Sequence, residues 1–329
     1  MKPRVDVVVV SVDSTSGWRA AARALVAGLT RAGARVASVG TGPVPLVRTF
    51  MLTDLVQARA ARRAAVGAIA EHDGAPVIYC SMTAALLWPR PGAIWLDSVA
   101  AENRPGRHGV WQRMVERRRL AEAPLVLAMS RRALDALPEV RADAVVRVPV
   151  SPSGPPGPHR DIAAVTYAAN PSKRRLDLVL AAWARAKRPG ETLVVAGLEG
   201  YAPVPAGVEL SGRLDPSAYR ALLRRARVFV TAPVREDYGI APLEALADGC
   251  ILVTTPARGG YPALELARAL DSRLVSEDLA PALRLALDDP VPEYSERAAE
   301  LLEPYSPAAV DRTLAQAVLP RLLTACGRA

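Results

Sequence analysis

The chain has 329 residues, half of them hydrophobic and 23% charged, which suits two globular domains with ample cores. Its formal net charge of +9 favours an anionic partner, either a phosphorylated ligand, an acidic membrane surface or nucleic acid, although an arginine-rich solvated surface gives the same charge. No apolar stretch approaches the roughly 20 residues that span a bilayer, no signal peptide is recognisable, and the isolated cysteines and histidines exclude a disulfide framework and a histidine metal site.

The first half of the sequence alternates buried strands with amphipathic helices. Residues 6–12 form a continuous β-branched run, which is typical of a central parallel strand covered on both faces. A helix follows, Gly33 ends it, and residues 35–39 form the next strand. Further strands are expected at 76–80, 93–97, 124–129 and 144–148. The alternation predicts a doubly wound α/β domain over residues 1–150.

A second α/β domain is predicted over residues 161–305, after a Pro/Gly-rich linker at 151–160. Its strands are expected at 162–168, 191–196, 208–211, 228–231 and 251–254, and its helices at 174–187, 216–226 and 241–247. Three helical patterns follow, the last near 307–323, and the C-terminal helix at 306–329 could pack back on the N-terminal domain. A ligand is expected in the cleft where the carboxyl ends of the two sheets face each other.

The turn after the first strand holds small residues and lacks G-x-G-x-x-G, so we expect no NAD site. Ser16 and Gly17 begin the helix that follows. Small residues admit a ligand to the backbone, and a helix N-terminus favours phosphate, which makes both residues candidate phosphate ligands. An ordinary tight turn is the alternative.

The most informative segment holds two glutamates eight positions apart. Glu236 lies in a loop after a buried strand, and Glu244 lies in the first turns of a helix. Gly239, Ile240 and Ala241 lie at the start of that helix, where unpaired N–H groups and the dipole attract anions. Two carboxylates beside such a helix start suit a phosphate-linked sugar, whose hydroxyls donate to the carboxylates. A solvated helix face with ordinary caps is the alternative.

This segment resembles the E-x7-E signature of the retaining family 4 glycosyltransferases. The remaining parts of the pattern follow in order at 211–215, 219–231 and 255–260, with a basic turn upstream at 169–180. The resemblance covers about residues 160–260 well, and the N-terminal half in architecture only. It implies the GT-B fold, with two Rossmann-like domains facing each other across a cleft, an acceptor-binding domain first and a nucleotide-sugar-binding domain second.

The resemblance also implies how the donor is held. Glu244 matches the acid that binds the donor ribose hydroxyls, and residues 239–241 match the amides that face sugar and phosphates. The segment at 212–213 matches the one that runs past the nucleobase. With Ser16 and Gly17 from the first helix start, the expected donor-binding residues are Ser16, Gly17, Gly212, Arg213, Gly239, Ile240, Ala241 and Glu244.

The expected catalytic residues are Glu236, Lys173, Arg174 and Asp97. Glu236 matches the acid near the transferred sugar, while Lys173 and Arg174 match the basic position that neutralises the leaving diphosphate. Ala168 stands where the family often has an arginine, so Lys173, Arg174 and Arg175 would share that work. Asp97 stands where the family often has a histidine, and a turn or helix-cap aspartate is its alternative interpretation.

The implied reaction needs no metal or other cofactor, since no suitable D-x-D loop occurs. A nucleoside-diphosphate sugar such as a UDP- or GDP-hexose is the co-substrate, and the acceptor is a small molecule, a glycan or a lipid. Fixed donors would stabilise the leaving diphosphate, and its phosphate would serve as the base. The anomeric configuration of the hexose would be retained.

The chain is expected in the cytoplasm, which suits three unpaired cysteines. Two segments, 44–52 and 107–119, place arginines beside bulky apolar residues, as interfacial helices do on acidic membranes. Peripheral membrane contact is therefore an alternative to a buried stripe of Trp111, Met114 and Val115. A GT-B nucleotide-sugar epimerase is the runner-up function. Nucleic-acid binding is not expected, because no helix-turn-helix or stacking-aromatic pattern occurs.

Overall fold

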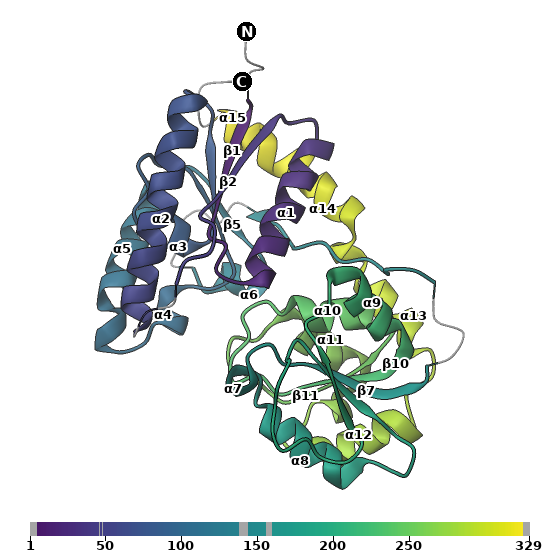
Figure 1. Ribbon diagram of the computed structural model, residues 1–329. Helices are drawn as coiled ribbons and strands as arrows, with labels where there is room; N and C mark the ends of the chain where they lie inside the picture. Colours follow the sequence, from purple (N-terminus) through teal and green to yellow (C-terminus); the bar gives the residue numbers. More distant parts are fainter. Residues whose placement is uncertain (1–4, 46, 48, 138–143, 156–159, 325–329) are drawn as a thin grey trace. The chain divides into compact units, whose positions relative to one another are not determined.

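The computed structural model describes residues 5–45, 47, 49–137, 144–155 and 160–324. The chain divides into two compact units, the first comprising Met1–Pro149 with Pro307–Ala329 and the second Val150–Ser306 (Figure 1). In its described residues each unit is built on a parallel sheet with helices on both faces. The predicted α/β fold class is therefore confirmed.

The sheet of the first unit has the strand order β2-β1-β3-β4-β5-β6. Its strands are β1 (Val7–Ser11), β2 (Val36–Gly40), β3 (Val77–Cys80), β4 (Ala93–Leu96), β5 (Val126–Ala128) and β6 (Ala144–Val145), and all neighbours are parallel. The valines of β1 are fully buried. Val8 and Val10 belong to one hydrophobic core, and because side chains alternate along a strand, Val7 and Val9 point to the opposite face. Burial on both faces explains why this strand reads as an unbroken apolar run.

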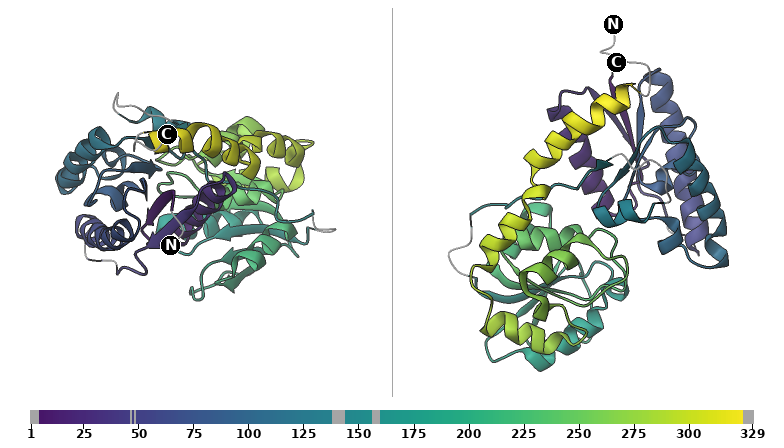
Figure 2. Two further views of the ribbon diagram at one scale, coloured as in Figure 1. Left: turned by 90° about the horizontal axis from the view of Figure 1, so that it is seen from above. Right: turned by 180° about the vertical axis from the view of Figure 1, so that it is seen from behind.

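Helices cover both faces of this sheet. They are α1 (Ser16–Arg31), α2 (Phe50–Glu71), α3 (Met82–Ala85), α4 (Ala100–Asn103), η1 (Arg107–Gly109), α5 (Val110–Glu122), α6 (Arg131–Asp135), α14 (Pro307–Thr313), η4 (Leu314–Val318) and α15 (Leu319–Thr324). The last three follow the second unit in sequence but belong to the first: α14 and η4 pack on α1, and α15 continues from η4 (Figures 1 and 2). Leu314 is fully buried there, and Arg31 Nε lies 2.6 Å from Asp311 Oδ2.

The sheet of the second unit has the order β11-β10-β7-β8-β9 and is also parallel. Its strands are β7 (Ile162–Tyr167), β8 (Leu193–Ala196), β9 (Val208–Gly212), β10 (Ala226–Thr231) and β11 (Ile251–Thr254). Its helices are α7 (Pro171–Arg174), α8 (Leu176–Ala186), α9 (Pro216–Arg225), α10 (Ile240–Ala247), α11 (Pro262–Asp271), η2 (Ser272–Leu274), α12 (Leu279–Asp288), α13 (Tyr294–Leu301) and η3 (Glu303–Tyr305). Helices α8 and α12 pack together on one face, and α9, α10, α11 and α13 cover the other (Figure 1).

The structure corrects three details of the predicted elements. The strands predicted at 124–129 and 144–148 are shorter, because only Val126–Ala128 and Ala144–Val145 join the ladder. More than three helices follow β11: in the described residues there are five α-helices, α11 to α15, with the short segments η2, η3 and η4 between them. The helix predicted at 174–187 is two helices, which changes the surroundings of the basic turn.

None of the helices in the described part of the chain is both long and apolar enough to cross a bilayer.

Candidate functional site

Most of the predicted site residues gather at one edge of the second sheet. The carboxyl ends of β7, β9 and β10 lead into the segments that carry them, and these ends share one edge because the strands are parallel. The residues brought to this edge are Lys173, Arg174, Gly212, Arg213, Glu236, Gly239, Ile240, Ala241 and Glu244. Ser16, Gly17 and Asp97 belong to the first unit, where they follow β1 and β4.

Glu236 is held tightly in the loop between β10 and α10. Only 8% of the residue is exposed, its backbone N–H donates to Arg258 O (2.9 Å), and its carboxylate forms an ion pair with the guanidinium of Arg174. Two glycines with positive φ make room for this segment. A Cβ on Gly259 would overlap the carbonyl oxygen of Glu236, and one on Gly239 would lie 3.1 Å from its Cγ.

The N-terminus of α10, with its backbone N–H groups, lies at the same sheet edge as Glu236. Gly239 is its N-cap in the left-handed conformation (φ 76°), and no side chain caps the helix. Pro242 has no N–H, so the free donors at this end are the amides of residues 239–241. The helix dipole adds partial positive charge there, and the end is suited to an anion.

Glu244 lies one turn further along α10 and retains accessible carboxylate, with 26% of its side chain exposed. Burial raises its pKa to about 7, against the opposing effect of Arg220. Arg220 Nη1 is 3.8 Å from Glu244 Oε1, but this guanidinium is committed elsewhere, to Asp248 Oδ2 (2.5 Å) and Ser151 O (2.7 Å). Sequence reasoning did not single out Arg220, which reaches Glu244 only because α9 packs on α10, or Asp248, which lies four residues after Glu244 at the end of α10.

The basic turn differs from its prediction. Asn170 caps α7 by accepting from the Lys173 N–H (2.9 Å), and Arg175 then adopts a left-handed conformation (φ 44°), which ends that helix. Lys173 and Arg174 therefore lie at the end of a short helix, so the helix predicted to begin at residue 174 does not begin there. The strained backbone at Arg175 is offset by hydrogen bonds from its guanidinium to Ala232 O (2.8 Å) and Thr255 Oγ1 (2.7 Å).

The three basic residues of the turn thus have different surroundings. Arg175 is bound to backbone and hydroxyl oxygens, and Arg174 is paired with Glu236. Lys173 is exposed, and its ammonium group contacts no acceptor among the described residues. Val234 N–H donates to Lys173 O (3.0 Å), which ties the turn to the loop that carries Glu236. Lys173 is therefore the cation of this turn that remains available to an anion.

The segment expected beside the nucleobase ends β9. Gly212 has a positive φ (69°), and its carbonyl oxygen accepts from Gly197 N–H (2.8 Å), while Arg213 is exposed. Ala168 is fully buried and donates its N–H to Ala196 O (2.8 Å), so its methyl group belongs to the interior.

In the first unit the predicted residues occupy ordinary capping surroundings. Ser16 and Gly17 form the first turn of α1, whose cap is Thr15: its hydroxyl accepts from the Trp18 N–H (3.1 Å). Asp97 follows β4 and accepts from Ser98 Oγ (3.2 Å) in a hydrogen-bonded turn. This geometry matches the turn-aspartate interpretation of Asp97, and its catalytic role stays a prediction.

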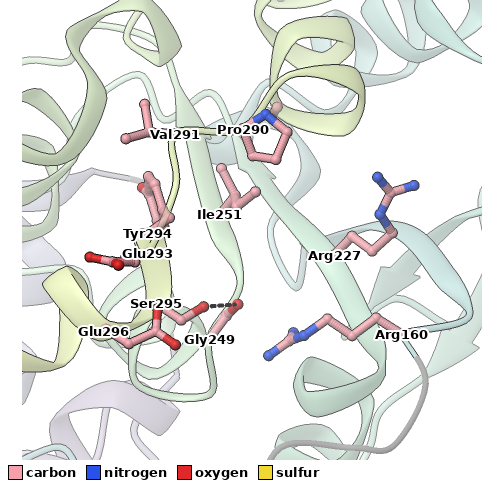
Figure 3. A pocket seen from close by; sticks show the side chains of 11 residues that line it. Arg160, Arg227, Gly249, Ile251, Pro290, Val291, Glu293, Tyr294, Ser295 and Glu296 are labelled. Carbon is pink, nitrogen blue, oxygen red and sulfur yellow. Dashed lines mark hydrogen bonds between the residues drawn. The ribbon is translucent and has the colours of Figure 1, made fainter.

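A separate cavity of about 290 Å³ lies near the opposite end of the second sheet (Figure 3). Ile251 at the start of β11 lines it together with Arg160 and Arg227. Both arginines donate to backbone carbonyls, Arg160 to Ala226 O and to Asp248 O (2.7 Å), and Arg227 to Leu287 O. The cavity contains none of the predicted site residues, and its arginines hold the fold together.

No group of three or more His, Cys, Asp or Glu side chains in the described ranges is arranged to hold a metal ion.

Comparison with known proteins identifies the family of the second unit and the fold of both. Residues 158–300 match the family model of the glycosyl transferases, group 1. Sucrose-phosphate synthase from Thermosynechococcus elongatus is similar in fold, with a TM-score of 0.67 at 16% identity over 98% of this chain and 100% of that one. HepE of Anabaena, solved in complex with UDP and glucose, gives a TM-score of 0.65 at 14% identity over 95% of this chain and 99% of that one.

The GtfA/B complex is a more distant likeness, with a TM-score of 0.56 at 14% identity over 81% of this chain. The present chain spans only 60% of the length of that match. No curated protein sequence matches significantly. The structural likenesses, together with the two parallel sheets, confirm the GT-B fold that the sequence resemblance implied.

Proposed function

Since residues 158–300 belong to the glycosyl transferases of group 1, we propose that the chain is a retaining glycosyltransferase that moves a hexose from a nucleoside-diphosphate sugar to an acceptor hydroxyl without a metal ion. One observation carries this proposal. Lys173, the Arg174–Glu236 pair, the amide end of α10 and Glu244 share one edge of the second sheet. Together they offer cations, N–H donors and carboxylates, the complement of a sugar joined to a diphosphate.

The proposed roles follow from these contacts. The amides of residues 239–241 and the ammonium group of Lys173 stabilise the charge that grows on the leaving diphosphate. Glu236, fixed by Arg174, faces the transferred sugar, and Glu244 accepts hydrogen bonds from the ribose. The bond from the anomeric carbon to the diphosphate oxygen breaks, the acceptor oxygen bonds to the same face, and its proton passes to the leaving phosphate. This proton transfer removes the need for a separate general base.

Donor screening by thermal shift is the first test, with UDP-, GDP- and ADP-hexoses. HepE was solved with UDP and glucose, which supports UDP-glucose as the first donor to try. A ligand at 100 times its dissociation constant adds about 2.7 kcal/mol to the free energy of unfolding, which such a screen detects readily. Turnover of the stabilising donor should then persist in excess EDTA. A loss of turnover that Mg²⁺ restores would contradict metal independence, and free epimerised sugar nucleotide without acceptor would favour an epimerase instead.

The proposal includes a peripheral contact with an acidic membrane from the cytoplasmic side. The predicted stripe of Trp111, Met114 and Val115 is not the buried face of α5, which is formed by Gln112, Glu116 and Leu120. Met114 is 63% exposed and Val110, one turn earlier, is 52% exposed. Exposed arginines surround this apolar pair, namely Arg107, Arg117 and Arg118. Apolar side chains among arginines are suited to the headgroup region of an anionic leaflet.

Vesicle flotation tests this contact. The chain should float with vesicles containing phosphatidylglycerol and not with pure phosphatidylcholine, and Val110→Glu/Met114→Glu should abolish flotation. Leu301→Glu, which changes an apolar side chain of the second unit that is 38% exposed, is the matched control and should leave flotation intact. Equal flotation of all variants would show that α5 does not contact the lipid.

A further inference from the structure

Arg175 joins two helices in a backbone conformation that arginine rarely adopts. It caps the C-terminus of α7 and the N-terminus of α8, with φ 44° and ψ 54° in the left-handed region. Its Cβ makes this region unfavourable, and such a residue persists only where surrounding contacts impose the conformation. Residues of this kind gather at functional sites, which makes the contacts of Arg175 informative about the reaction.

The guanidinium of Arg175 connects the ends of two neighbouring strands. Nε donates to the carbonyl oxygen of Ala232 (2.8 Å), directly after β10, and Nη2 donates to Thr255 Oγ1 (2.7 Å), directly after β11. Both acceptor residues are fully buried, so the guanidinium is directed into the sheet edge, whereas Lys173 is exposed. Because α7 follows β7, and β10 lies between β7 and β11, Arg175 links the ends of three adjacent strands. Hydrogen bonds from a charged donor are strong enough to hold the left-handed residue in place.

The same turn makes two further contacts with the loop between β10 and α10. Lys173 O accepts from the Val234 N–H (3.0 Å), and Arg174 forms the ion pair with Glu236. With the bond from Arg175, all three basic residues of the turn contact this loop. The turn and the loop that carries Glu236 are therefore fastened to each other, and Arg175 is the residue that also fastens both to β11.

We propose that Arg175 is a positioning residue for sugar transfer, which sets the places of Lys173 and the Arg174–Glu236 pair without touching the donor. The inference rests on the proposed function, which assigns these groups to the leaving diphosphate and the transferred sugar. A displacement of about 1 Å in groups that act in the transition state can slow a reaction about 100-fold. Arg175 thus acts through the conformation of the turn, and its own charge serves the two strand ends.

Thr255→Val tests this role, because it removes one acceptor of the guanidinium and leaves Arg175 itself unchanged. The assay is release of the nucleoside diphosphate from UDP-, GDP- or ADP-hexose, whichever the wild-type chain uses best, with water as the acceptor. The kcat should fall about 10- to 100-fold, while KM for the donor should change about threefold or less. Thr255→Ser keeps the hydroxyl and should recover most of the wild-type kcat. Thr166→Val, at a buried threonine of β7, is the matched control and should keep the wild-type kcat.

A double-mutant cycle shows whether the two residues act together. Arg175→Gly relieves the left-handed backbone and removes both hydrogen bonds, so it should lower kcat at least as much as Thr255→Val. Adding Thr255→Val to Arg175→Gly should cost no further rate, since both changes remove the same contact. Additive losses would overturn the inference.

The remaining outcomes separate positioning from other roles. An unchanged kcat in Thr255→Val would overturn the inference while the proposed function stands; if Arg175→Gly then weakened binding of UDP relative to uridine, Arg175 would be a direct ligand of the diphosphate. Rates are measured at a temperature where circular dichroism shows every variant folded, and a loss of kcat explained by the unfolded fraction would also overturn it. Failure of the wild-type chain to release a diphosphate from any of the three donors would overturn the proposed function and this inference with it.

Discussion

Glu116 and Glu244 have similar pKa values in different surroundings. Burial raises the pKa of each to about 7. Both oxygens of Glu116 accept the backbone N–H of Ala100 (2.8 and 2.9 Å), and only 6% of the residue is exposed. Glu244 keeps an accessible edge and no such partner. The first carboxyl is therefore committed to holding the segment after β4, and the second is open to a ligand.

Glu116→Gln should flatten the dependence of stability on pH. A carboxyl whose pKa is raised on folding stabilises fully below its unfolded value near 4.5 and loses that contribution as pH rises through 7. The amide keeps an oxygen for the Ala100 N–H but does not ionise. From pH 5 to pH 7.5, the free energy of unfolding measured in urea should therefore fall less in the variant than in the wild type. The difference between the two falls should be a few kcal/mol at most, on the order of the shift in pKa. Glu300→Gln, an exposed position, is the control and should keep the wild-type drop.

The two acids of the proposed donor site should behave differently. Glu244→Gln removes a charged acceptor and should weaken donor binding by about 1.5–3 kcal/mol, whereas Glu236→Gln should lower kcat more than donor affinity. Because the Glu244 carboxylate, with a pKa of about 7, is the accepting form, wild-type donor affinity should fall below pH 7 and that of Glu244→Gln should not. Steady-state kinetics and titration across pH 6–8 provide the measurement. If both substitutions have equal and small effects, Glu236 and Glu244 are ordinary surface carboxylates.

Lys173→Ala should weaken binding of a nucleoside diphosphate far more than binding of the nucleoside. The reason is that Lys173 is the exposed cation of its turn, while Arg174 is already paired with Glu236. Adding Arg174→Ala also leaves the Glu236 carboxylate unpaired, so the double variant should lose turnover as well. Calorimetry with UDP and uridine, or the GDP or ADP pair, measures the first effect. If diphosphate affinity is unchanged, another basic group holds the leaving phosphate.

At the scale of elements, periodicity in the sequence located the strands well because most of them are buried apolar runs. It failed where backbone conformation depends on distant partners. Nothing local to 174–187 predicts a break, since Arg175 becomes left-handed only when Ala232 and Thr255 accept from it. The polar inner face of α5 was missed for the same reason, because Asp54 on α2 binds Gln112. The E-x7-E spacing singled out Glu236 and Glu244, whereas the approach of Arg220 to Glu244 depends on the packing of α9 on α10.

Gly259→Ala should disable the loop that carries Glu236. The residue has a φ of 98°, and a Cβ would overlap the carbonyl oxygen of Glu236, so backbone must move. We expect a loss of about 1–3 kcal/mol in the free energy of unfolding and a larger loss of turnover. Urea unfolding and donor turnover are the measurements. Gly200→Ala, with open space around its Cβ and no positive φ, is the matched control and should match the wild type in both.

At the scale of the whole molecule, the two sheets and their parallel topology were predicted from strand–helix alternation. The functions assigned to the two units, acceptor binding and donor binding, stay predictions. The last helical run joins the first unit because its apolar stripe packs on α1. A Cβ on Gly28 would lie 2.6 Å from Leu314 Cδ1, which shows how closely the two helices approach.

Leu314→Ala should therefore destabilise the first unit alone. Leu314 is fully buried, and truncation of such a side chain costs about 2–5 kcal/mol. Unfolding should begin at lower urea, while nucleoside diphosphate binding by the second unit persists in the early part of the transition. Val66→Ala, at a site that is 48% exposed on α2, is the control and should leave the transition in place. If nucleoside diphosphate binding is lost at the same urea concentration at which the first unit unfolds, the two units do not unfold independently.

The return of α14 and α15 to the first unit also orders events during synthesis. A nascent chain that has emerged as far as Ser306 contains every described residue of the second unit, but its first unit still lacks the helices that pack along α1. Domains fold as units while they leave the ribosome, normally with the N-terminal one first. Here the later unit is complete before the earlier one, so the part of α1 that α14 and η4 contact stays exposed until translation has passed the whole of the second sheet.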